Sequence, residues 1–330
     1  MLIILGTDVS KKTLDSHLLR DDQDEKGLSK RVPNTPEGFA SLLAWVEAKT
    51  TAVPSQLYVV MEATGPYHEA FAQAMVRAGC QVVVANPARV KYFARSEGIR
   101  TKTDPVDARV LACYGRKNPR LRRWQPEAPE YCQLKALLTR RDALERDLQR
   151  ERNRYEKATI NVPAPWLLES FQRTEDFLRS EIAQLTQQIE QHLANHPVLQ
   201  HDRQLLQSIP GVGPVVAVMM VALLQHGARF DSAPQAAAYL GLTPIEVHSG
   251  SSVHQPAHLS KIGPARWRAK LYLPAVVAAQ HNPDVNALYQ RLRARGKSKM
   301  AALGAAMRKL VHICFGVIKH QAVYQSQISA

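Results

Sequence analysis

Two short apolar runs in the N-terminal third of the chain end in an acidic residue, and this pattern constrains the fold more than any other. The runs are LIILGTD at 2–8 and QLYVVME at 56–62, so Asp8 and Glu62 close them. A helically spaced stretch, EGFASLLAWVEA, lies between them, and another, HEAFAQAMVRAGC, precedes a third apolar run, QVVVANP. Strands that alternate with helices predict an α/β layer fold over residues 1–125.

Four carboxylates in this region are the strongest candidates for chemistry. Asp8 and Glu62 would lie at the carboxyl ends of strands, where α/β sheets collect their functional groups. Asp104 and Asp107, in TKTDPVDAR, are three residues apart and would share one face of a helix. At about 4 Å and an effective dielectric near 20, each like-charged pair costs about 4 kcal/mol, which a divalent cation would relieve. All-oxygen ligands suit Mg²⁺ or Mn²⁺, so the acids predict a metal site for phosphoryl transfer.

Taken singly, some of these acids also have a structural explanation. Asp104 is well placed to cap a helix, with Pro105 at the first helical position and Asp107 near the positive end of the helix dipole. Asp8 could be a turn residue. Only the four together, in a basic protein, favour a metal site.

The net charge narrows the class of partner. Of 330 residues, 43 are Lys or Arg and 29 are Asp or Glu, which gives a formal charge of +14. A surplus of this size favours nucleic acid ahead of an anionic membrane. The four cysteines form no C-x-x-C pair and fit a reducing compartment. The sequence has no recognisable signal peptide, and its longest apolar run, residues 215–224, is too short to span a bilayer. We therefore expect a cytoplasmic protein without a membrane partner.

Residues 126–198 change to a helical pattern. Leu178, Ile182, Leu185 and Ile189 step by four, three and four, the spacing of a coiled-coil seam. We therefore predict a helical coiled-coil hairpin. An exposed apolar seam needs a partner. Either an earlier helix of the same chain or a second copy, in a dimerisation arm, would cover it, and the pattern does not choose between them.

The C-terminal part, residues 199–330, is predicted to be mainly helical and to contain a helix–hairpin–helix. IPGVGPVVA at 209–217 places Gly211 and Gly213 between two helices. Glycines at such a turn let the backbone approach a phosphate and direct helix-start N–H groups at it. Such contacts position a protein on a nucleic-acid backbone without reading the bases. The alternative is a tight helix–helix turn that binds no ligand.

Two basic groups in the same part are candidates for nucleic-acid contacts. One surrounds Trp267, which could equally be a core aromatic residue, and this group also includes Lys270. The other has basic residues at every second position; in an extended chain they would form one edge, whereas in a helix they would scatter. The candidates are Lys261, Arg266, Arg268, Arg291, Arg293, Arg295, Lys297 and Lys299.

A serine-rich stretch, EVHSGSSVHQ, occupies residues 246–255. Its composition is typical of a solvated loop, but such a loop could also place one hydroxyl against a phosphate. Local chemistry does not distinguish Ser249, Ser251 and Ser252, and the histidines on either side are more often incidental than catalytic.

Several motifs occur here in a fixed order. DxxK follows the first run and EATGPY the second; TKTDPVDA, IPGVG, and GLTP followed by HSGSSV come after them. This set resembles the DEDD transposases of bacterial insertion sequences, relatives of the Piv-type invertases that are also called bridge-RNA-guided recombinases. The resemblance covers roughly residues 3–320, and no single motif carries it.

The resemblance implies three domains: a RuvC-like domain of ribonuclease-H fold at 1–125, a coiled-coil arm at 126–198 and a transposase domain at 199–330. It also implies a set of catalytic metal ligands, namely Asp8, Glu62, Asp104 and Asp107.

In the family pattern the nucleophile is the first serine of S-G-S-S-V, which here is Ser249. The implied mechanism is a covalent 5′-phosphoserine intermediate, at a site whose acids come from one protomer and whose serine comes from another. The implied partners are donor and target DNA, a structured guide RNA, and further copies of the chain, as a dimer that assembles into a tetramer.

Three other functions deserve comparison. The acids alone would serve a RuvC-like nuclease that makes no covalent intermediate. The hairpin and basic groups alone would serve a non-catalytic nucleic-acid-binding protein. GTDVSKKTLD resembles the first phosphate loop of sugar kinases, but no second phosphate loop follows, and a small-molecule kinase does not need a charge of +14.

Overall fold

The computed structural model describes residues 3–21, 23–24, 26–118, 120–160, 164–249 and 253–328. The chain forms two compact units, Met1–Glu127 and Ala128–Ala330. The predicted α/β fold of the N-terminal part and the mainly helical C-terminal part are both confirmed. The predicted arm falls inside the second unit, and the three-part domain division stays a prediction.

A five-stranded mixed sheet forms the centre of the first unit, in the order β3-β2-β1-β4-β5. Strands β1, β4 and β5 are parallel, whereas β2 pairs antiparallel with both β1 and β3. The strands are β1 (Ile3–Val9), β2 (Thr13–Leu19), β3 (Leu28–Pro33), β4 (Leu57–Glu62) and β5 (Gln81–Ala85). The three parallel strands are the three apolar runs of the sequence, while β2 and β3 were not predicted.

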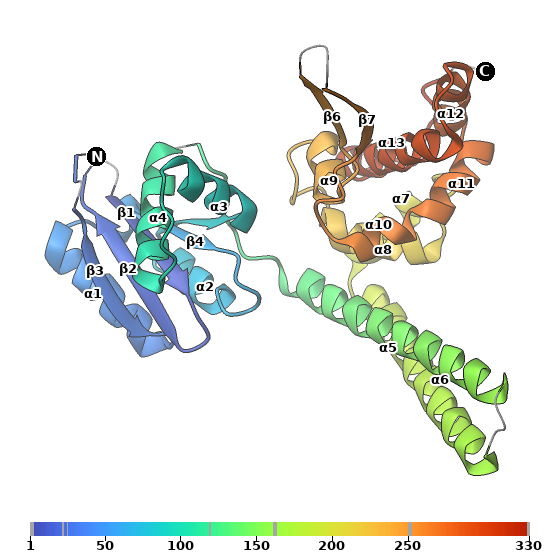
Figure 1. Ribbon diagram of the computed structural model, residues 1–330, viewed down its shortest axis with the longest axis horizontal. Helices are drawn as coiled ribbons and strands as arrows, with labels where there is room; N and C mark the ends of the chain where they lie inside the picture. Colours follow the sequence, from blue (N-terminus) through green and yellow to red (C-terminus); the bar gives the residue numbers. More distant parts are fainter. Residues whose placement is uncertain are drawn as a thin grey trace. The chain divides into compact units, whose positions relative to one another are not determined.

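Helices cover both faces of this sheet (Figure 1). The helices are α1 (Pro36–Thr50), α2 (Glu69–Arg77), α3 (Pro87–Ser96) and α4 (Asp104–Lys117), with a short 3₁₀ turn at Pro54–Gln56. Because successive strand residues point to opposite faces, Leu5 packs with α1 and α2 while Ile4 packs with α4. Each face therefore has its own apolar core.

Gly6 lets α4 lie directly on β1. A Cβ at this position would come within 2.2 Å of the Ala112 nitrogen and 2.3 Å of the Ala108 oxygen. No side chain fits between the strand and the helix backbone there. The absence of a side chain at Gly6 therefore fixes where the N-terminal turn of α4 stands relative to the end of β1.

Two long helices begin the second unit. Helix α5 (Pro129–Ile160) and helix α6 (Pro165–Ala194) pack against each other as a hairpin (Figure 1). Arg152 on α5 donates to Glu175 on α6 at 3.0 Å. Along the predicted seam on α6, Leu178 and Ile189 are buried, and the two seam residues between them, Ile182 and Leu185, are partly buried. The hairpin thus covers its own seam, while a coiled-coil geometry and a dimerisation role stay predictions.

The remainder of the second unit is a helical cluster with one β-hairpin. Its helices are α7 (Pro197–Gln207), α8 (Pro214–Leu224), α9 (Ala233–Tyr239), α10 (Ala265–Lys270), α11 (Tyr272–His281), α12 (Pro283–Ala294) and α13 (Lys299–His320). The hairpin consists of β6 (Pro244–Ser249) and β7 (Val253–Leu259). Helix α8 is buried at every residue from Val216 to Leu224, so the apolar run of the sequence is a core helix.

Helix α13 is long and apolar enough to cross a bilayer by length and composition alone. However, 56% of its most apolar window is buried inside the unit, where Leu310, Cys314 and Ile318 join the core. A long buried core helix has this same composition, so its length is weak evidence for a membrane span.

Candidate active site

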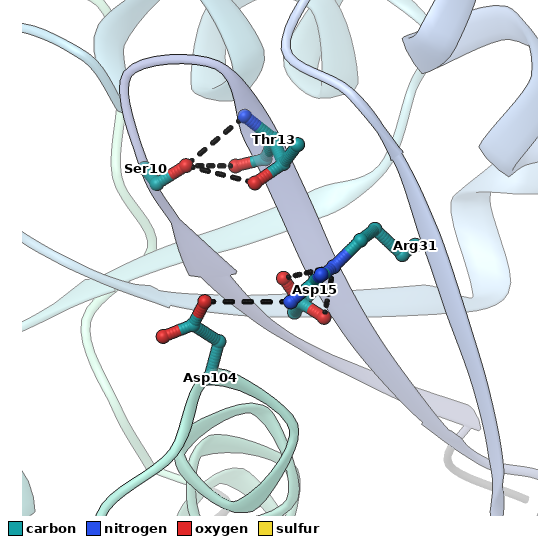
Figure 2. Close-up of polar contacts among 5 residues, drawn as sticks. All are labelled: Ser10, Thr13, Asp15, Arg31 and Asp104. Atoms are coloured by element: carbon teal, nitrogen blue, oxygen red, sulfur yellow. Dashed lines mark hydrogen bonds and ion pairs between the residues drawn. The ribbon is translucent and has the colours of Figure 1, made fainter.

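The first two strands place Asp8 beside a second acid, Asp15. A tight connection closes β1 and β2: the Ser10 hydroxyl accepts from the Thr13 nitrogen at 3.0 Å and donates to the Thr13 oxygen at 2.9 Å (Figure 2). The resulting register pairs Asp8 with Asp15. Directly paired residues of antiparallel strands share a face, and Asp8 lies on the same side of β1 as Ile4, which faces α4.

Glu62 and the two aspartates of α4 complete the group. Glu62 is the last residue of β4, on the side of that strand shared by Tyr58 and Val60, which also pack with α4. Asp104 and Asp107 lie in the first turn of α4. The four predicted acids therefore come from three elements that meet at the carboxyl ends of the parallel strands.

Asp104 does not cap its helix. Thr103 occupies the N-cap position, while Asp104 and Pro105 are already helical. The structural explanation of Asp104 as the cap is therefore wrong. Its carboxylate instead accepts a hydrogen bond from Arg31 Nη2 at 3.4 Å (Figure 2).

The negative charges of the acids act on one another. The pKa of Asp8 is raised to about 6, first by burial and then by the charges of Asp107, Asp104, Glu62 and Asp15. Each neighbouring negative charge makes the ionised form of Asp8 less favourable. A carboxyl group in this position is a functional-site candidate, because a purely structural acid is normally compensated.

Glu62 and Asp107 show the same effect in weaker form. Burial is the first cause that raises the pKa of each carboxyl group. The positive charge of Lys102 opposes this rise in both. Lys102 precedes α4 by two residues, and its charge acts on both acids.

The donor set fits a divalent cation, but the ligating arrangement is not formed. Four carboxylates offer only oxygen ligands, which hard cations such as Mg²⁺ prefer. The mutual repulsion at Asp8 is the kind that such a charge relieves. Within the described ranges, however, no three His, Cys, Asp or Glu side chains are close enough to hold an ion. Asp104 points to Arg31 instead, so ion binding requires side chains to move.

Three residues of this region were not predicted: Asp15, Arg31 and Lys102. Asp15 and Arg31 belong to β2 and β3, whose mixed polar sequence gives no clear strand pattern. Only the register Asp8–Asp15–Arg31 brings them to the site. Lys102 lies within the TKTDPVDA motif itself; a cation next to four clustered acids was the available signal.

Ser249 is the last residue of β6 and pairs in register with Val253 of β7. It therefore lies at the end of a β-hairpin, in the second unit. Its side chain, and those of His248 and His254, are outside the described part of the chain. Ser251 and Ser252 lie outside the described residues altogether.

The IPGVG turn connects α7 to α8. Gly211 has φ +99°, and a Cβ there would come within 3.0 Å of the backbone of Ala278, so its glycine is explained by packing. Gly213 caps the start of α8, is exposed, and has open space around it. The tight turn therefore accounts for Gly211, while Gly213 leaves the helix start accessible to a phosphate. A nucleic-acid role for both stays a prediction.

Three of the four basic residues around Trp267 have structural partners, and one of them, Lys270, pairs with Asp142 of α5. Arg266 pairs with Asp142 of α5 at 3.2 Å. Arg268 donates to the backbone oxygens of Leu240 and of Lys261 at 3.1 and 3.2 Å. Trp267 itself is buried in the core, which favours its structural explanation. Lys261 is exposed.

The second basic group is not extended. Arg291 and Arg293 lie in the last turn of α12, and Lys299 begins α13. Arg295 and Lys297 lie on the exposed connection between the two helices. These side chains therefore do not form the single edge that an extended chain would give, although all of them except the half-buried Arg293 are exposed.

Comparison with known proteins connects both units to one class. A transposase model, the DEDD type of IS110, matches residues 5–159, and the model of the transposase IS116/IS110/IS902 family matches residues 203–290. The pilin gene-inverting proteins of Moraxella bovis and Moraxella lacunata are each 33% identical over 98% of this chain and 98% of their own. An uncharacterized 43.6 kDa protein of insertion element IS110 from Streptomyces coelicolor is 28% identical, over 52% of this chain and 40% of its own.

Proposed function

Because this chain belongs to the IS110 family of transposases, an enzyme family that acts on DNA, we propose that it cuts and rejoins DNA strands as the recombinase of an insertion sequence. The observation that carries the proposal is the convergence of four acids at the carboxyl ends of the parallel strands, namely Asp8, Glu62, Asp104 and Asp107. They lie within the segment that matches the DEDD transposase model.

The DEDD domain implies dependence on a divalent metal ion in general. We propose Mg²⁺, with Mn²⁺ as its substitute, held by the same four acids. When bound, the ion would stabilise the negative charge that develops on a phosphodiester during phosphoryl transfer. The protein's own contribution is to fix Asp8 and Glu62 at strand ends, where neither backbone can move without disturbing the sheet.

Ser249 is the proposed nucleophile. Its Oγ attacks the phosphorus of a DNA phosphodiester, the bond to the 3′ oxygen breaks, and the products are a 5′-phosphoserine and a free 3′ hydroxyl. The serine gives up its proton and the leaving 3′ oxygen takes one. Attack by another strand's 3′ hydroxyl reverses these steps and rejoins DNA without ATP. A serine hydroxyl needs activation, which we assign to the acid site.

The proposed assembly follows from the family resemblance. The acids belong to the first unit and Ser249 to the second, and we propose that a productive site takes them from different protomers of a dimer that assembles into a tetramer. A structured guide RNA pairs with donor and target DNA. The proposed division is a RuvC-like domain at 1–125, an arm at 126–198 and a transposase domain at 199–330; the charge of +14 supports a nucleic-acid-rich complex.

Ser249→Ala tests the chemistry. The full chain, with the RNA that co-purifies with it, is incubated with Mg²⁺ and a labelled duplex that carries the end of its own DNA element. Denaturing gels then show whether protein is covalently attached to nicked DNA. We expect wild-type protein to form the adduct and Ser249→Ala to form none, whereas Ser252→Ala, the matched hydroxyl control, retains it.

Two other results would redirect the proposal. An adduct that persists in Ser249→Ala removes Ser249 as the nucleophile. Metal-dependent cutting that survives in Ser249→Ala without any adduct supports the alternative, a RuvC-like endonuclease, whose acids lie in a unit that is compact by itself. Sequencing the co-purified RNA tests the guide separately: one structured species is expected rather than a mixture.

A further inference from the structure

A row of three charged residues crosses three adjacent strands beside the acid site. Asp8 on β1 is paired in register with Asp15 on β2, which is paired with Arg31 on β3. Paired residues of antiparallel strands share a face, so the row runs from the acid group to the edge of the sheet. Arg31 is thereby brought to the site by register alone.

Asp15 anchors the guanidinium of Arg31 at one end. Arg31 Nε lies 2.9 Å from Asp15 Oδ1 and 3.0 Å from Oδ2 (Figure 2). The Asp15 side chain is 8% exposed, whereas that of Arg31 is 56% exposed. The guanidinium of Arg31 is therefore hydrogen-bonded to a buried acid through Nε, while its outer part faces solvent.

The outer part of the guanidinium still has hydrogen-bonding capacity. An arginine has five N–H donors, of which Nε is used by Asp15 and one on Nη2 makes a long contact of 3.4 Å with Asp104. No other described residue accepts from Arg31. The remaining donors form a planar fork next to the proposed metal ligands, which matches the geometry of two phosphate oxygens.

A second pair in the same unit shows what an ordinary structural pair looks like. Arg20 Nε lies 2.8 Å from Asp24, with side-chain exposures of 47% and 5%. Arg20 follows the last residue of β2 and stands five residues beyond Asp15, about 17 Å away along an extended strand. The two pairs are alike in chemistry and exposure, but only Arg31 lies beside the acid group.

We propose that Arg31 is a substrate-binding residue of the active site, whose guanidinium, held by Asp15, binds the non-bridging oxygens of the DNA phosphodiester at the four acids. This inference rests on the proposed DNA-cutting function. The acids repel a phosphate, and Arg31 supplies a fixed positive charge on the solvent side of that group. Its contact with Asp104 is exchanged for the phosphate when DNA enters.

A competing explanation is that Arg31 only balances the charge of Asp104. In that case the guanidinium competes with the metal ion for Asp104 and never contacts DNA. The two explanations differ in measurable ways. A phosphate contact contributes to the salt dependence of DNA affinity, whereas a charge-balancing contact changes only the affinity for the metal ion.

The test compares Arg31→Ala and Arg31→Lys with the matched control Arg20→Ala. Each full-length variant, with its co-purified RNA, is titrated with a fluorescein-labelled duplex of the element end in Ca²⁺, at several salt concentrations. We expect Arg31→Ala to reduce the slope of log affinity against log salt by about 0.9, the loss of one phosphate contact. Arg31→Lys should keep the slope but bind less tightly, because the fork is lost; Arg20→Ala should match wild type.

Two further readouts complete the test. Single-turnover cleavage in Mg²⁺ should fall by about tenfold to a hundredfold in Arg31→Ala, the range for a hydrogen bond to a charged group. Mn²⁺ binding to the DNA-free protein, followed by electron paramagnetic resonance, should be unchanged or tighter. Thermal melting confirms that each variant is folded.

Several results would overturn the inference: a wild-type slope in Arg31→Ala, an equal loss in Arg20→Ala, or a loss of Mn²⁺ binding that accounts for the slower cleavage. Failure of the proposed function is distinguishable, because wild-type protein would then not cut the duplex at all. The salt slopes are measured without cutting and still report whether Arg31 contacts phosphate.

Discussion

The acid group of the first unit and the acid Asp142 of the second unit show two opposite ways of burying carboxylates. Asp142 on α5 is 5% exposed at its side chain and forms ion pairs with Arg266 and Lys270. Asp8, Glu62 and Asp107 form no ion pair with any residue in the described segments, and Asp8 faces other acids. Burial with compensating cations fastens one element to another, here α10 to α5, whereas burial without them leaves a charge deficit that a ligand can fill.

Structural and functional acids differ in the charges that the fold places around them. At Asp142 the sequence offers an acid amid many charges on a long helix, and the fold supplies its cations from residues more than a hundred positions away. Around Asp8 the fold brings further acids instead of cations. Arg31 is the intermediate case, since it compensates Asp15 and only touches Asp104.

The largest expected effect separates the two kinds of acid by activity. Asp107→Asn removes a proposed metal ligand, so single-turnover DNA cleavage in Mg²⁺ should fall at least about a thousandfold, or several kcal/mol of transition-state stabilisation. The melting temperature should not fall, because no described cation loses a partner. Asp176→Asn, an exposed acid on α6, is the control and should cut normally. Near-normal cleavage by Asp107→Asn would place the chemistry elsewhere.

The second prediction concerns the contact that positions the acids of α4. Gly6→Ala inserts a methyl group where the α4 backbone lies 2.2 Å away, and overpacking of this kind costs about 1–3 kcal/mol. Urea unfolding should show this loss, and Mn²⁺ affinity should fall because α4 is displaced from β1. The matched control is Gly316→Ala in α13, where an added Cβ meets nothing within 4 Å. Equal stability of the two variants would show that α4 does not need Gly6.

We expect Asp142 to contribute to stability and not to DNA cleavage. Asp142→Asn leaves Arg266 and Lys270 with an uncharged partner and should cost about 1–3 kcal/mol, reduced from the value for a fully buried pair because both cations are partly exposed. Asp147→Asn, which affects an exposed pair with Arg150, should change stability by less than about 1 kcal/mol. Urea titrations measure both, and cleavage per folded molecule should be unaffected.

The sequence was sufficient to predict the elements of the fold that have a simple apolar pattern. The apolar runs that become β1, β4 and β5 are buried parallel strands with a continuous apolar pattern. All four acids could be proposed as metal ligands from the sequence, because each stands at the end of such a run or in the first turn of α4. By contrast, β3 is a half-exposed edge strand, LSKRVP, whose polar residues hide its period.

What the sequence could not give was the pairing. Asp15 and Arg31 reach the site only because the β1–β2 connection sets the register and β3 follows it. A shift of one residue would turn Arg31 to the opposite face. In the second unit, Arg268 was predicted to contact nucleic acid because basic groups do so often, yet its bonds to the Leu240 and Lys261 oxygens depend on tertiary packing alone.

The smallest expected effect tests whether the charge deficit at Asp8 has an energetic cost. The pKa of Asp8 is raised from 3.8 to about 6 in the folded protein. Between these values the folded state binds more protons than the unfolded state, so its stability falls as the pH rises through this window and stays reduced above it. Without a divalent ion, Asp8→Asn removes that cost. Its melting temperature should therefore exceed that of wild type by roughly 2–4 °C at pH 7.5, and by little near pH 4.

A divalent ion should reverse the order of the two proteins. Saturating Mn²⁺ stabilises only the folded state of the protein that binds it, so wild type should gain in melting temperature at pH 7.5 and Asp8→Asn should gain less. Because ligand carboxylates must be deprotonated, the gain of wild type should shrink as the pH falls through about 6. A difference between the two proteins that is the same at pH 4 and pH 7.5, with or without Mn²⁺, would show that Asp8 carries no charge cost. The acid group of the first unit would then have a structural role, as Asp142 has in the second.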